Sequence, residues 1–423
     1  MNIGIVGLGY VGAPLAVALS RHFTVVGYDL NTVRVSELRS GYDRTEEINA
    51  AELTGCRAQW TADPAGIIPC DVVIVTVPTP VDEFHVPDLG AVKSATEIVG
   101  RYMRRGTIVV YESTVYPGVT EDICIPLLEQ TSGMAYPQDF HVGYSPERIN
   151  PGDRVHTLTT TTKIVAGDTP AVRDILTGIY GKITQVYPAQ TIKIAEAAKI
   201  LENTQRDINI ALMNELSQIF CRLGIDTTDV IDAASSKWNF MDFRPGLVGG
   251  HCISVDPYYL SHKAASHGIV ADMILSARHI NESMAGFVAD QTLRCMAQQK
   301  LLHKDTVVTI LGVTFKENVR DIRNSGVLAI YRQLAALGLD IQLIDPMADS
   351  DALLRDEGLH TTPLPAARPA DAVVLAVPHA EFRQQGWRLI ERLAQPGQPI
   401  VVIDVKAALP REECPGNVVH WRL

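Results

Sequence analysis

The feature that most constrains the fold is a glycine fingerprint at the start of the chain. Gly7-Leu8-Gly9-Tyr10-Val11-Gly12 follows an apolar strand-like run and opens a helical stretch. In such a pattern the first glycine permits a tight turn, the second lets backbone approach a pyrophosphate, and the third lets helix and strand pack closely. Asp29 ends the next predicted strand, where a carboxylate binds both ribose hydroxyls and repels a 2′-phosphate. These residues predict a domain that binds NAD rather than NADP; the alternative is a glycine-rich structural turn followed by a strand-end aspartate.

Strand and helix signals alternate in the first and last parts of the chain, with a helical middle. Residues 192–221 have helical periodicity without Pro or Gly, which predicts a spine helix of about 45 Å. A second long helix is predicted over residues 269–299. Apolar β-branched runs predict strands over residues 2–7, 24–29, 71–77, 107–111, 163–166, 306–312, 340–344, 372–377 and 400–405. The expected fold class is α/β: two Rossmann-like doubly wound domains, residues 1–185 and 301–423, joined by a helical central domain over residues 186–300.

Composition excludes several classes of protein. Hydrophobic residues make up 46%, which argues against disorder, and the net charge of −11 argues against nucleic-acid binding. The longest apolar runs are about ten residues, too short to cross a bilayer. Seven cysteines, an odd number without a CxxC pair, favour a reducing compartment. The first residues lack the basic region of a signal peptide, so we expect a cytoplasmic protein.

A glycine-rich loop carries the strongest candidate for a nucleophile. Three glycines closely precede Cys252, which lies next to His251 and four residues before Asp256. Glycines at such a density indicate backbone packed close to a ligand, and a thiol in this setting suits covalent catalysis. A small buried cysteine is the alternative. His251 and Cys252 lack further ligands at suitable spacing, so no metal site is predicted.

One face of the predicted spine helix carries three polar residues. Glu196, Lys199 and Asn203 stand at positions i, i+3 and i+7. A lysine and an amide side by side stabilise an alkoxide or a tetrahedral oxyanion. From spacing alone, an exposed ion pair between Glu196 and Lys199 is the stronger interpretation.

Three further segments are expected at the carboxyl ends of strands, where ligands bind in open α/β sheets. Val77-Pro78-Thr79-Pro80 is expected to face the cofactor crevice. Glu112-Ser113-Thr114 and Ser145-Pro146-Glu147-Arg148 are equally well explained as caps or turns.

Together these motifs resemble the UDP-glucose/GDP-mannose dehydrogenase family over nearly the whole chain. In chain order the resemblance rests on residues 7–12, 112–114 with Pro117-Gly118, 145–148, Glu196-x-x-Lys199-x-x-x-Asn203, 249–252, and 311–318 followed by Asp321-x-Arg323-x-Ser325. Residues 243–252 look most like the branch that oxidises UDP-N-acetylglucosamine or UDP-N-acetylgalactosamine. Residues 148–154 depart from the UDP-glucose pattern, which favours a different sugar.

The resemblance implies an NAD-dependent, four-electron oxidation of the sugar C6 hydroxyl to a carboxylate, through a thiohemiacetal and a thioester on Cys252. It implies that Lys199 and Asn203 stabilise charge on oxygen. A water positioned by Thr114 and Asp256, or by Lys199, relays the first proton, and Glu147 with Asp256 activates the water that ends the reaction. A homodimer through the spine helix, a nucleotide-sugar site in the last domain and a role in capsule or O-antigen synthesis are also implied.

The resemblance extends the set of ligand contacts expected from the motifs. The expected cofactor contacts are Gly7, Gly9, Tyr10, Val11, Gly12, Asp29, Arg34, Pro78, Thr79, Thr114 and Arg323. The expected substrate contacts are Glu147, Arg148, Lys199, Asn203, Arg244, Gly249, Phe315 and Lys316. A bidentate guanidinium suits a diphosphate, although Arg244 is also explained as a surface arginine.

Other functions are compatible with parts of the pattern. Within the family, UDP-glucose or GDP-mannose is the alternative substrate. A two-electron NAD-dependent hydroxy-acid dehydrogenase would use the lysine but need no cysteine. A sensor of NAD or of a nucleotide sugar would bind without turnover, which the joint presence of six catalytic residue types argues against.

Overall fold

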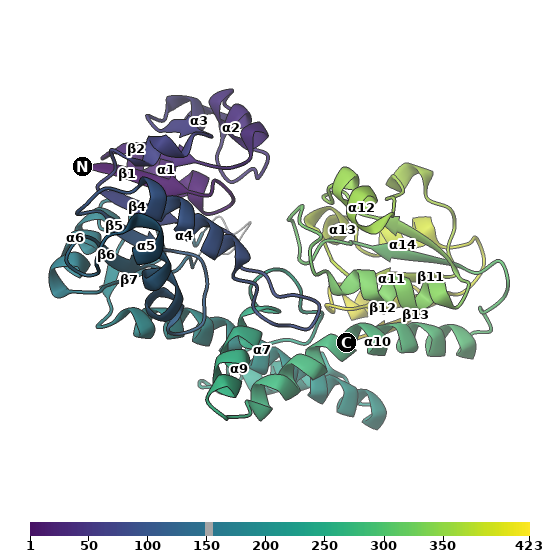
Figure 1. The fold of residues 1–423 in the computed structure, drawn as a ribbon. Helices are drawn as coiled ribbons and strands as arrows, with labels where there is room; N and C mark the ends of the chain where they lie inside the picture. Colours follow the sequence, from purple (N-terminus) through teal and green to yellow (C-terminus); the bar gives the residue numbers. More distant parts are fainter. Residues whose placement is uncertain (149–154) are drawn as a thin grey trace. The chain divides into compact units, whose positions relative to one another are not determined.

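The structure, a computed structural model, describes residues 1–148 and 155–423 of the chain (Figure 1). It divides into two compact units. The N-terminal unit comprises Met1–Glu202 and Tyr258–Val270, and the C-terminal unit comprises Asn203–Pro257 and Ala271–Leu423. The central domain predicted over residues 186–300 is shared between these units, and the three-domain division stays a prediction.

The N-terminal unit is built on an eight-stranded sheet in the order β3-β2-β1-β4-β5-β6-β7-β8. Among the described residues, β6 and β7 are the only antiparallel neighbours in it. The strands are β1 (Asn2–Val6), β2 (Thr24–Tyr28), β3 (Gln59–Thr61), β4 (Val72–Val75), β5 (Ile108–Tyr111), β6 (His141–Tyr144), β7 (Lys163–Gly167) and β8 (Val186–Pro188). The helices are α1 (Gly12–Ser20), α2 (Thr32–Arg39), α3 (Ala50–Gly55), α4 (Gly90–Tyr102), α5 (Ile125–Ser132) and α6 (Pro170–Tyr180).

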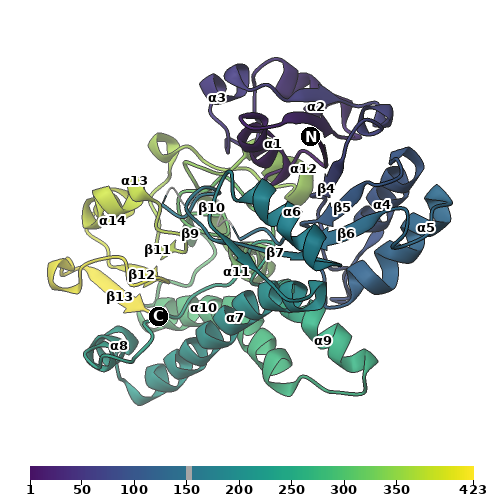
Figure 2. The ribbon, with the colours of Figure 1, turned by 90° about the vertical axis from the view of Figure 1, so that its left-hand side faces the viewer.

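Helices cover both faces of this sheet, so its central strands are apolar on both sides. Ile3 and Ile5 of β1 share a buried cluster with residues of α1 and α6. Tyr111, at the end of β5, bonds through its hydroxyl to Thr96 of α4 at 3.0 Å, and α4 packs against α5. Figure 2 shows α1 and α6 on one side of the strands and α4 and α5 on the other.

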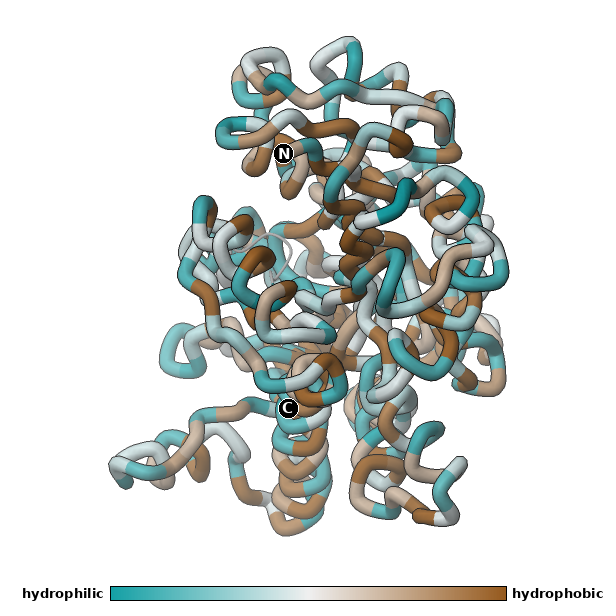
Figure 3. Tube along the Cα trace, turned by 60° about the vertical axis from the view of Figure 1, so that its left-hand side comes forward, coloured by the Kyte–Doolittle hydropathy of each residue, from teal (hydrophilic) through white to brown (hydrophobic). Residues whose placement is uncertain are grey.

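The C-terminal unit contains an all-parallel sheet in the order β10-β9-β11-β12-β13. Its strands are β9 (Val307–Leu311), β10 (Asp340–Ile344), β11 (Ala372–Leu375), β12 (Ile400–Asp404) and β13 (Val418–Arg422). The helices around it are α10 (Asp272–Gln298), α11 (Gly326–Ala336), α12 (Ser350–Glu357), α13 (Ala380–Gln385) and α14 (Trp387–Leu393). One apolar cluster joins the strands to α10 and α11. A second cluster joins them to α13 and α14. In Figure 3 hydrophobic stretches of the chain (brown) alternate with hydrophilic ones (teal) along the trace.

The helical middle of the chain contains the predicted spine. Helix α7 (Ile192–Leu223) has 32 residues and begins in the N-terminal unit and ends in the C-terminal unit. Helices α8 (Thr227–Ser235), α9 (Asp256–Ser266) and α10 follow it. Two largely parallel sheets with helices on both faces, and a helical segment between them in sequence, confirm the predicted fold class. In the described part of the chain, no helix combines the length and apolarity needed to cross a bilayer.

The first glycine loop is held by close contact between β1, α1 and β4. Gly7 has φ of +94°, a conformation that favours glycine. A Cβ on Gly12 would lie 1.9 Å from the Gly7 oxygen and 2.4 Å from Oγ1 of Thr76, whereas a Cβ on Gly9 would meet nothing within 4 Å. Gly12 therefore allows helix and strand to touch, and Gly9 leaves open space above the loop.

We expect Gly12→Ala to destabilise the N-terminal unit by about 3 kcal/mol, the upper end of the usual cost of overpacking, because backbone must move to admit the methyl group. Urea unfolding followed by circular dichroism measures this. Gly9→Ala is the matched control and is expected to unfold at the wild-type midpoint. Equal midpoints for the two variants would contradict the prediction.

Candidate active site

The glycine loop and the end of β2 form one edge of the N-terminal unit. Tyr10 is exposed on this loop, and Val11 stands at the N-terminus of α1. The Asp29 carboxylate accepts hydrogen bonds from the backbone N–H of Leu8, at 2.7 Å, and of Asn31, at 2.8 Å. The carboxylate is thus fixed beside the open space over Gly9, an arrangement that fits a dinucleotide with its pyrophosphate at the loop and its ribose at Asp29.

Arg34 supports this loop from inside. Its Nε donates to the Leu8 oxygen at 2.7 Å, and its Nη2 pairs with Asp43 at 2.8 Å. Arg34 is 5% exposed. These contacts explain Arg34 as a residue that shapes the loop, while the cofactor contact expected of it stays a prediction.

The segment after β4 lies at the same edge, because β4 pairs in parallel with β1. The Thr76 hydroxyl donates to the Gly7 oxygen at 2.7 Å. The Tyr259 hydroxyl donates to the backbone oxygen of Thr79 at 2.9 Å, which fixes the loop that contains Pro78 and Thr79. Sequence reasoning gave no role to Tyr259, since no motif marked it.

Thr114 lies in the loop that follows β5, and Glu196 of α7 holds this loop. Carboxylate oxygens of Glu196 accept hydrogen bonds from the backbone N–H of Gly118, at 2.6 Å, and of Thr120, at 3.0 Å. Glu196 is fully buried. The exposed ion pair between Glu196 and Lys199, the stronger interpretation from spacing alone, is therefore wrong: the carboxylate satisfies two backbone donors in the interior instead.

Lys199, one turn further along α7, is 7% exposed. Within the described residues its ammonium makes no hydrogen bond or ion pair. A lysine whose side chain is mostly buried and whose ammonium has no acceptor among the described residues leaves that ammonium available to an oxygen supplied by a ligand.

Glu147 and Arg148 follow β6 at the same edge. Arg148 pairs with Glu202 at 2.7 Å and donates to the Thr162 oxygen at 2.6 Å. Glu147 lies 3.2 Å from the ammonium of Lys163, which also contacts Glu112 at 2.8 Å. Sequence reasoning missed Lys163 as a site residue, although a lysine opening an otherwise apolar strand was a detectable signal. Of the atypical segment 148–154, residues 149–154 lie outside the described residues.

In the C-terminal unit, the cysteine loop packs on the segment that follows β9. A Cβ on Gly249 would lie 2.5 Å from the Asn324 oxygen, and one on Gly250 would lie 2.9 Å from the Phe315 ring. The Asn324 amide donates to the Gly250 oxygen at 3.1 Å. These glycines allow the loop to pack closely on that segment, and Cys252 follows them as a half-buried cysteine outside any disulfide.

Asn203 joins the cysteine loop to α7 within the same unit. Its Nδ2 donates to Oδ2 of Asp256 at 2.6 Å, and the backbone N–H of Asp256 donates to the Cys252 oxygen at 2.8 Å. Asn203 and Asp256 are both buried. The Asn203 amide and the Asp256 carboxylate, 53 residues apart in sequence, are thus held together, and the Asp256 backbone lies one helical turn after Cys252.

The remaining predicted contacts lie in the C-terminal unit and have partners there. Burial, reinforced by the charge of Arg323, lowers the pKa of His251 to about 4, so this imidazole is neutral at pH 7. Arg323 pairs with Asp321 at 2.7 Å, and the Lys316 ammonium lies 5.7 Å from the centre of the Phe315 ring. Arg244 pairs with Asp232 and with Asp242, both at 2.7 Å.

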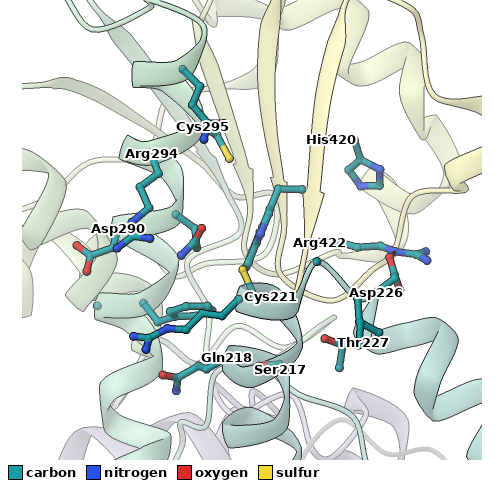
Figure 4. Close-up of a pocket in the computed structure, with 18 of the residues that line it drawn as sticks. Ser217, Gln218, Cys221, Asp226, Thr227, Asp290, Arg294, Cys295, His420 and Arg422 are labelled. Carbon is teal, nitrogen blue, oxygen red and sulfur yellow. Dashed lines mark hydrogen bonds and ion pairs between the residues drawn. The ribbon is translucent and has the colours of Figure 1, made fainter.

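Across the described residues, no cluster of three or more His, Cys, Asp or Glu side chains is arranged to hold a metal. The C-terminal unit does contain a cavity of about 740 Å³ between the end of α7, α10 and the end of β13. Figure 4 shows Cys221, Asp290, Arg294 and Arg422 around it. No predicted site residue lines this cavity, so it does not help to assign the reaction.

Comparisons with known proteins match most of the chain in three successive parts. Residues 1–184 match the NAD binding domain of the UDP-glucose/GDP-mannose dehydrogenase family, residues 193–283 its central domain, and residues 309–411 its UDP binding domain.

Individual proteins show the same similarity. The chain is 44% identical over 416 residues to UDP-N-acetyl-D-glucosamine 6-dehydrogenase of Pseudomonas aeruginosa, covering 98% of both chains. It is 45% identical over 416 residues to the protein of that name from Salmonella typhi, covering 98% of this chain and 97% of the other. The structure is similar to that of a UDP-D-ManNAc dehydrogenase from Pyrococcus horikoshii, with a TM-score of 0.89 and 28% identity over 100% of this chain and 99% of that one.

Glu196 gives a prediction about pH and stability. Burial raises the pKa of Glu196 to about 7, against the effect of the Gly118 and Thr120 donors, from a usual value of 4.5. The folded state therefore holds this proton more tightly than the unfolded state. The resulting stabilisation is present in full below the unfolded pKa and is lost as pH rises through about 7.

Glutamine cannot ionise, so Glu196→Gln lacks this pH-dependent loss of stability. Between about pH 5 and pH 8 the free energy of unfolding of the wild type is expected to fall, relative to that of Glu196→Gln, by on the order of 2 kcal/mol. Urea unfolding across this range measures the difference. Glu97→Gln, at an exposed position of α4, controls for the loss of one carboxylate. A difference that does not change with pH would contradict the assignment.

Proposed function

The chain belongs to the UDP-glucose/GDP-mannose dehydrogenase family, and we propose that it oxidises the C6 hydroxyl of a UDP-N-acetylhexosamine to a carboxylate with two NAD in turn. The predicted family, the dehydrogenase class and the NAD cofactor are confirmed by the family match. The names of the two bacterial relatives support UDP-N-acetylglucosamine as the first substrate to test, with UDP-N-acetylgalactosamine second.

The observation that carries the proposal is the buried hydrogen bond between Asn203 and Asp256, one helical turn after Cys252, in the C-terminal unit. A two-electron oxidation of a hydroxy acid needs no cysteine beside such a pair. A protein that only senses its ligands needs no nucleophile at all. The arrangement therefore supports a route in which the substrate is bound covalently to sulfur between two oxidations.

The first half of the reaction converts the alcohol to an aldehyde. Bound NAD supplies the oxidant by accepting hydride. Lys199 and Asn203 stabilise negative charge on the C6 oxygen, and a water held by Thr114 and Asp256, or by Lys199, accepts the hydroxyl proton. Lys199 suits this task because its side chain is mostly buried and, in the part of the chain that the structure describes, no acceptor occupies its ammonium.

The second half converts the aldehyde to an acid. The Cys252 thiolate adds to the aldehyde carbon, and loss of a second hydride turns the thiohemiacetal into a thioester. Water activated by Glu147, with Asp256, attacks the acyl carbon; the carbon–sulfur bond breaks and the thiolate returns. The sum is one alcohol, two NAD and one water giving one carboxylate, two NADH and three protons.

Three further expectations belong to this proposal. A homodimer through α7, a cytoplasmic location and a place in surface-polysaccharide synthesis all stay predictions. The substrate contacts expected of Arg148, Arg244, Gly249, Phe315 and Lys316 stay predictions as well.

Stoichiometry tests the proposed reaction. With limiting sugar and excess NAD, we expect two NADH for each UDP-N-acetylglucosamine or UDP-N-acetylgalactosamine consumed, counted by absorbance at completion. UDP-glucose and GDP-mannose serve as comparison substrates. One NADH per sugar would contradict the thioester route, and turnover of only UDP-glucose or GDP-mannose would overturn the choice of sugar.

Cys252→Ala is expected to reduce the yield to at most one NADH per sugar, because the aldehyde then has no thiol to bind for its second oxidation. Absorbance and chromatography of the product measure NADH and uronate together. Cys414→Ala, a free cysteine elsewhere in the C-terminal unit, is the matched control and is expected to give two NADH. Full uronate formation by Cys252→Ala would show that the thiol is not the nucleophile.

A further inference from the structure

A buried lysine joins two of the motif segments in the N-terminal unit. Lys163 is the first residue of β7 and is 3% exposed. Its Nζ lies 2.8 Å from Oε2 of Glu112, 3.2 Å from Oε2 of Glu147 and 3.4 Å from the Pro146 oxygen. The three N–H groups of the ammonium therefore each have an acceptor.

The topology of the sheet explains how the lysine reaches this place. Glu112 and Glu147 follow the parallel strands β5 and β6, so both lie at the carboxyl edge. Strand β7 runs antiparallel to β6, with Gly143 opposite Gly167 and Tyr144 opposite Ala166. Continued in that register, position 163 lies opposite position 147. The reversed strand thus brings its first side chain to the edge where the other strands end.

The two carboxylates differ in access to solvent. The side chain of Glu112 is fully buried, and its Oε1 accepts a hydrogen bond from the Tyr180 hydroxyl at 2.5 Å. The side chain of Glu147 is 14% exposed, and its Oε1 accepts from the backbone N–H of Arg148 at 2.6 Å. Only Glu147 of this pair is therefore open to water.

Electrostatics support a charged lysine between them. Burial alone would lower the pKa of Lys163, but the charges of Glu112 and then Glu147 raise it above its usual value. Burial raises the pKa of Glu112, with Lys163 opposing and Glu147 adding to that shift. The buried site thus keeps Lys163 charged, and it disfavours a negative charge on Glu112 in addition to the one on Glu147.

We propose that Lys163 is a positioning residue for thioester hydrolysis, which fixes Glu147 as the carboxylate that accepts a proton from the attacking water while Glu112 and Tyr180 anchor Lys163 from the interior. This rests on the proposed function, because it requires an acyl group on Cys252. Water loses one proton to Glu147, its oxygen bonds to the acyl carbon, and the carbon–sulfur bond breaks to release the thiolate.

A purely structural role for Lys163 makes a different prediction. Buried ion pairs contribute little net stability, and neutral groups of similar shape often replace them without loss. A structural defect would slow substrate binding and all chemical steps alike. Loss of a positioning residue for hydrolysis would leave the two oxidations intact and slow only the release of the acid.

The test is rapid-quench analysis of Lys163→Met with enzyme in excess over UDP-N-acetylglucosamine. Two NADH are expected at near the wild-type rate, followed by uronate formation slowed by about 100-fold, the lower range for loss of general-base catalysis. Intact-protein mass spectrometry of quenched samples is expected to show an acyl adduct on Cys252. Lys163→Arg keeps the charge and is expected to recover most of the hydrolysis rate.

Two further variants protect the test against a folding defect. Lys163→Met combined with Glu112→Gln removes the lysine without leaving an uncompensated buried carboxylate, and it is expected to accumulate the same adduct. Lys182→Met, at an exposed position after α6, is expected to behave as the wild type.

Either of two outcomes overturns the proposal. If the wild type yields two NADH and folded Lys163→Met accumulates no adduct, or loses the oxidations and hydrolysis in equal measure, Lys163 has no specific role in hydrolysis. If the wild type itself yields one NADH per sugar, the proposed function fails first, and with it any role in releasing an acid.

Discussion

The carboxyl edge of a parallel sheet is the constraint on which the N-terminal unit depends. Loops after β1, β2, β4, β5 and β6 must all emerge at that edge, because these strands run in one direction. The glycine loop, Asp29, Pro78, Thr114 and Glu147 occupy those loops in turn. Five short segments spread over 140 residues of sequence therefore meet at one edge through strand direction alone.

Loops at an edge stay in place only if their backbone groups find partners. Gly118 and Thr120 donate to the buried Glu196 of α7, so the helix that carries Lys199 is fastened to the loop that carries Thr114. In the C-terminal unit, Asn203 of the same helix bonds to Asp256 beside the cysteine loop. Side chains spaced along α7 thus differ in role, because Glu196 satisfies backbone donors whereas Lys199 and Asn203 are the residues proposed to act on the substrate.

The sequence predicted the structure correctly where a local pattern is compatible with only one conformation. The glycine fingerprint, the strand that ends at Tyr28 and the long proline-free helix were predicted to within two residues at each end. Pattern alone failed where contacts are distant in sequence: Glu196 pairs with backbone some 78 residues away, not with Lys199. The short strand β6 was missed, and so was the reversal of β7 that brings Lys163 to Glu147, since strand direction leaves no signal in a run of apolar residues.

Two buried lysines of the N-terminal unit differ in whether the protein supplies acceptors for their ammonium groups. Lys163 has three acceptors within 3.4 Å, so its hydrogen-bonding capacity is filled by the protein and nothing remains for a ligand. Lys199 is buried to a similar degree, yet its ammonium has no acceptor within the described residues. An ammonium that the protein leaves without an acceptor binds a ligand oxygen, and it stabilises most an oxygen that gains negative charge during a reaction. This difference supports the proposed division of roles, in which Lys163 positions a site residue and Lys199 contacts the substrate.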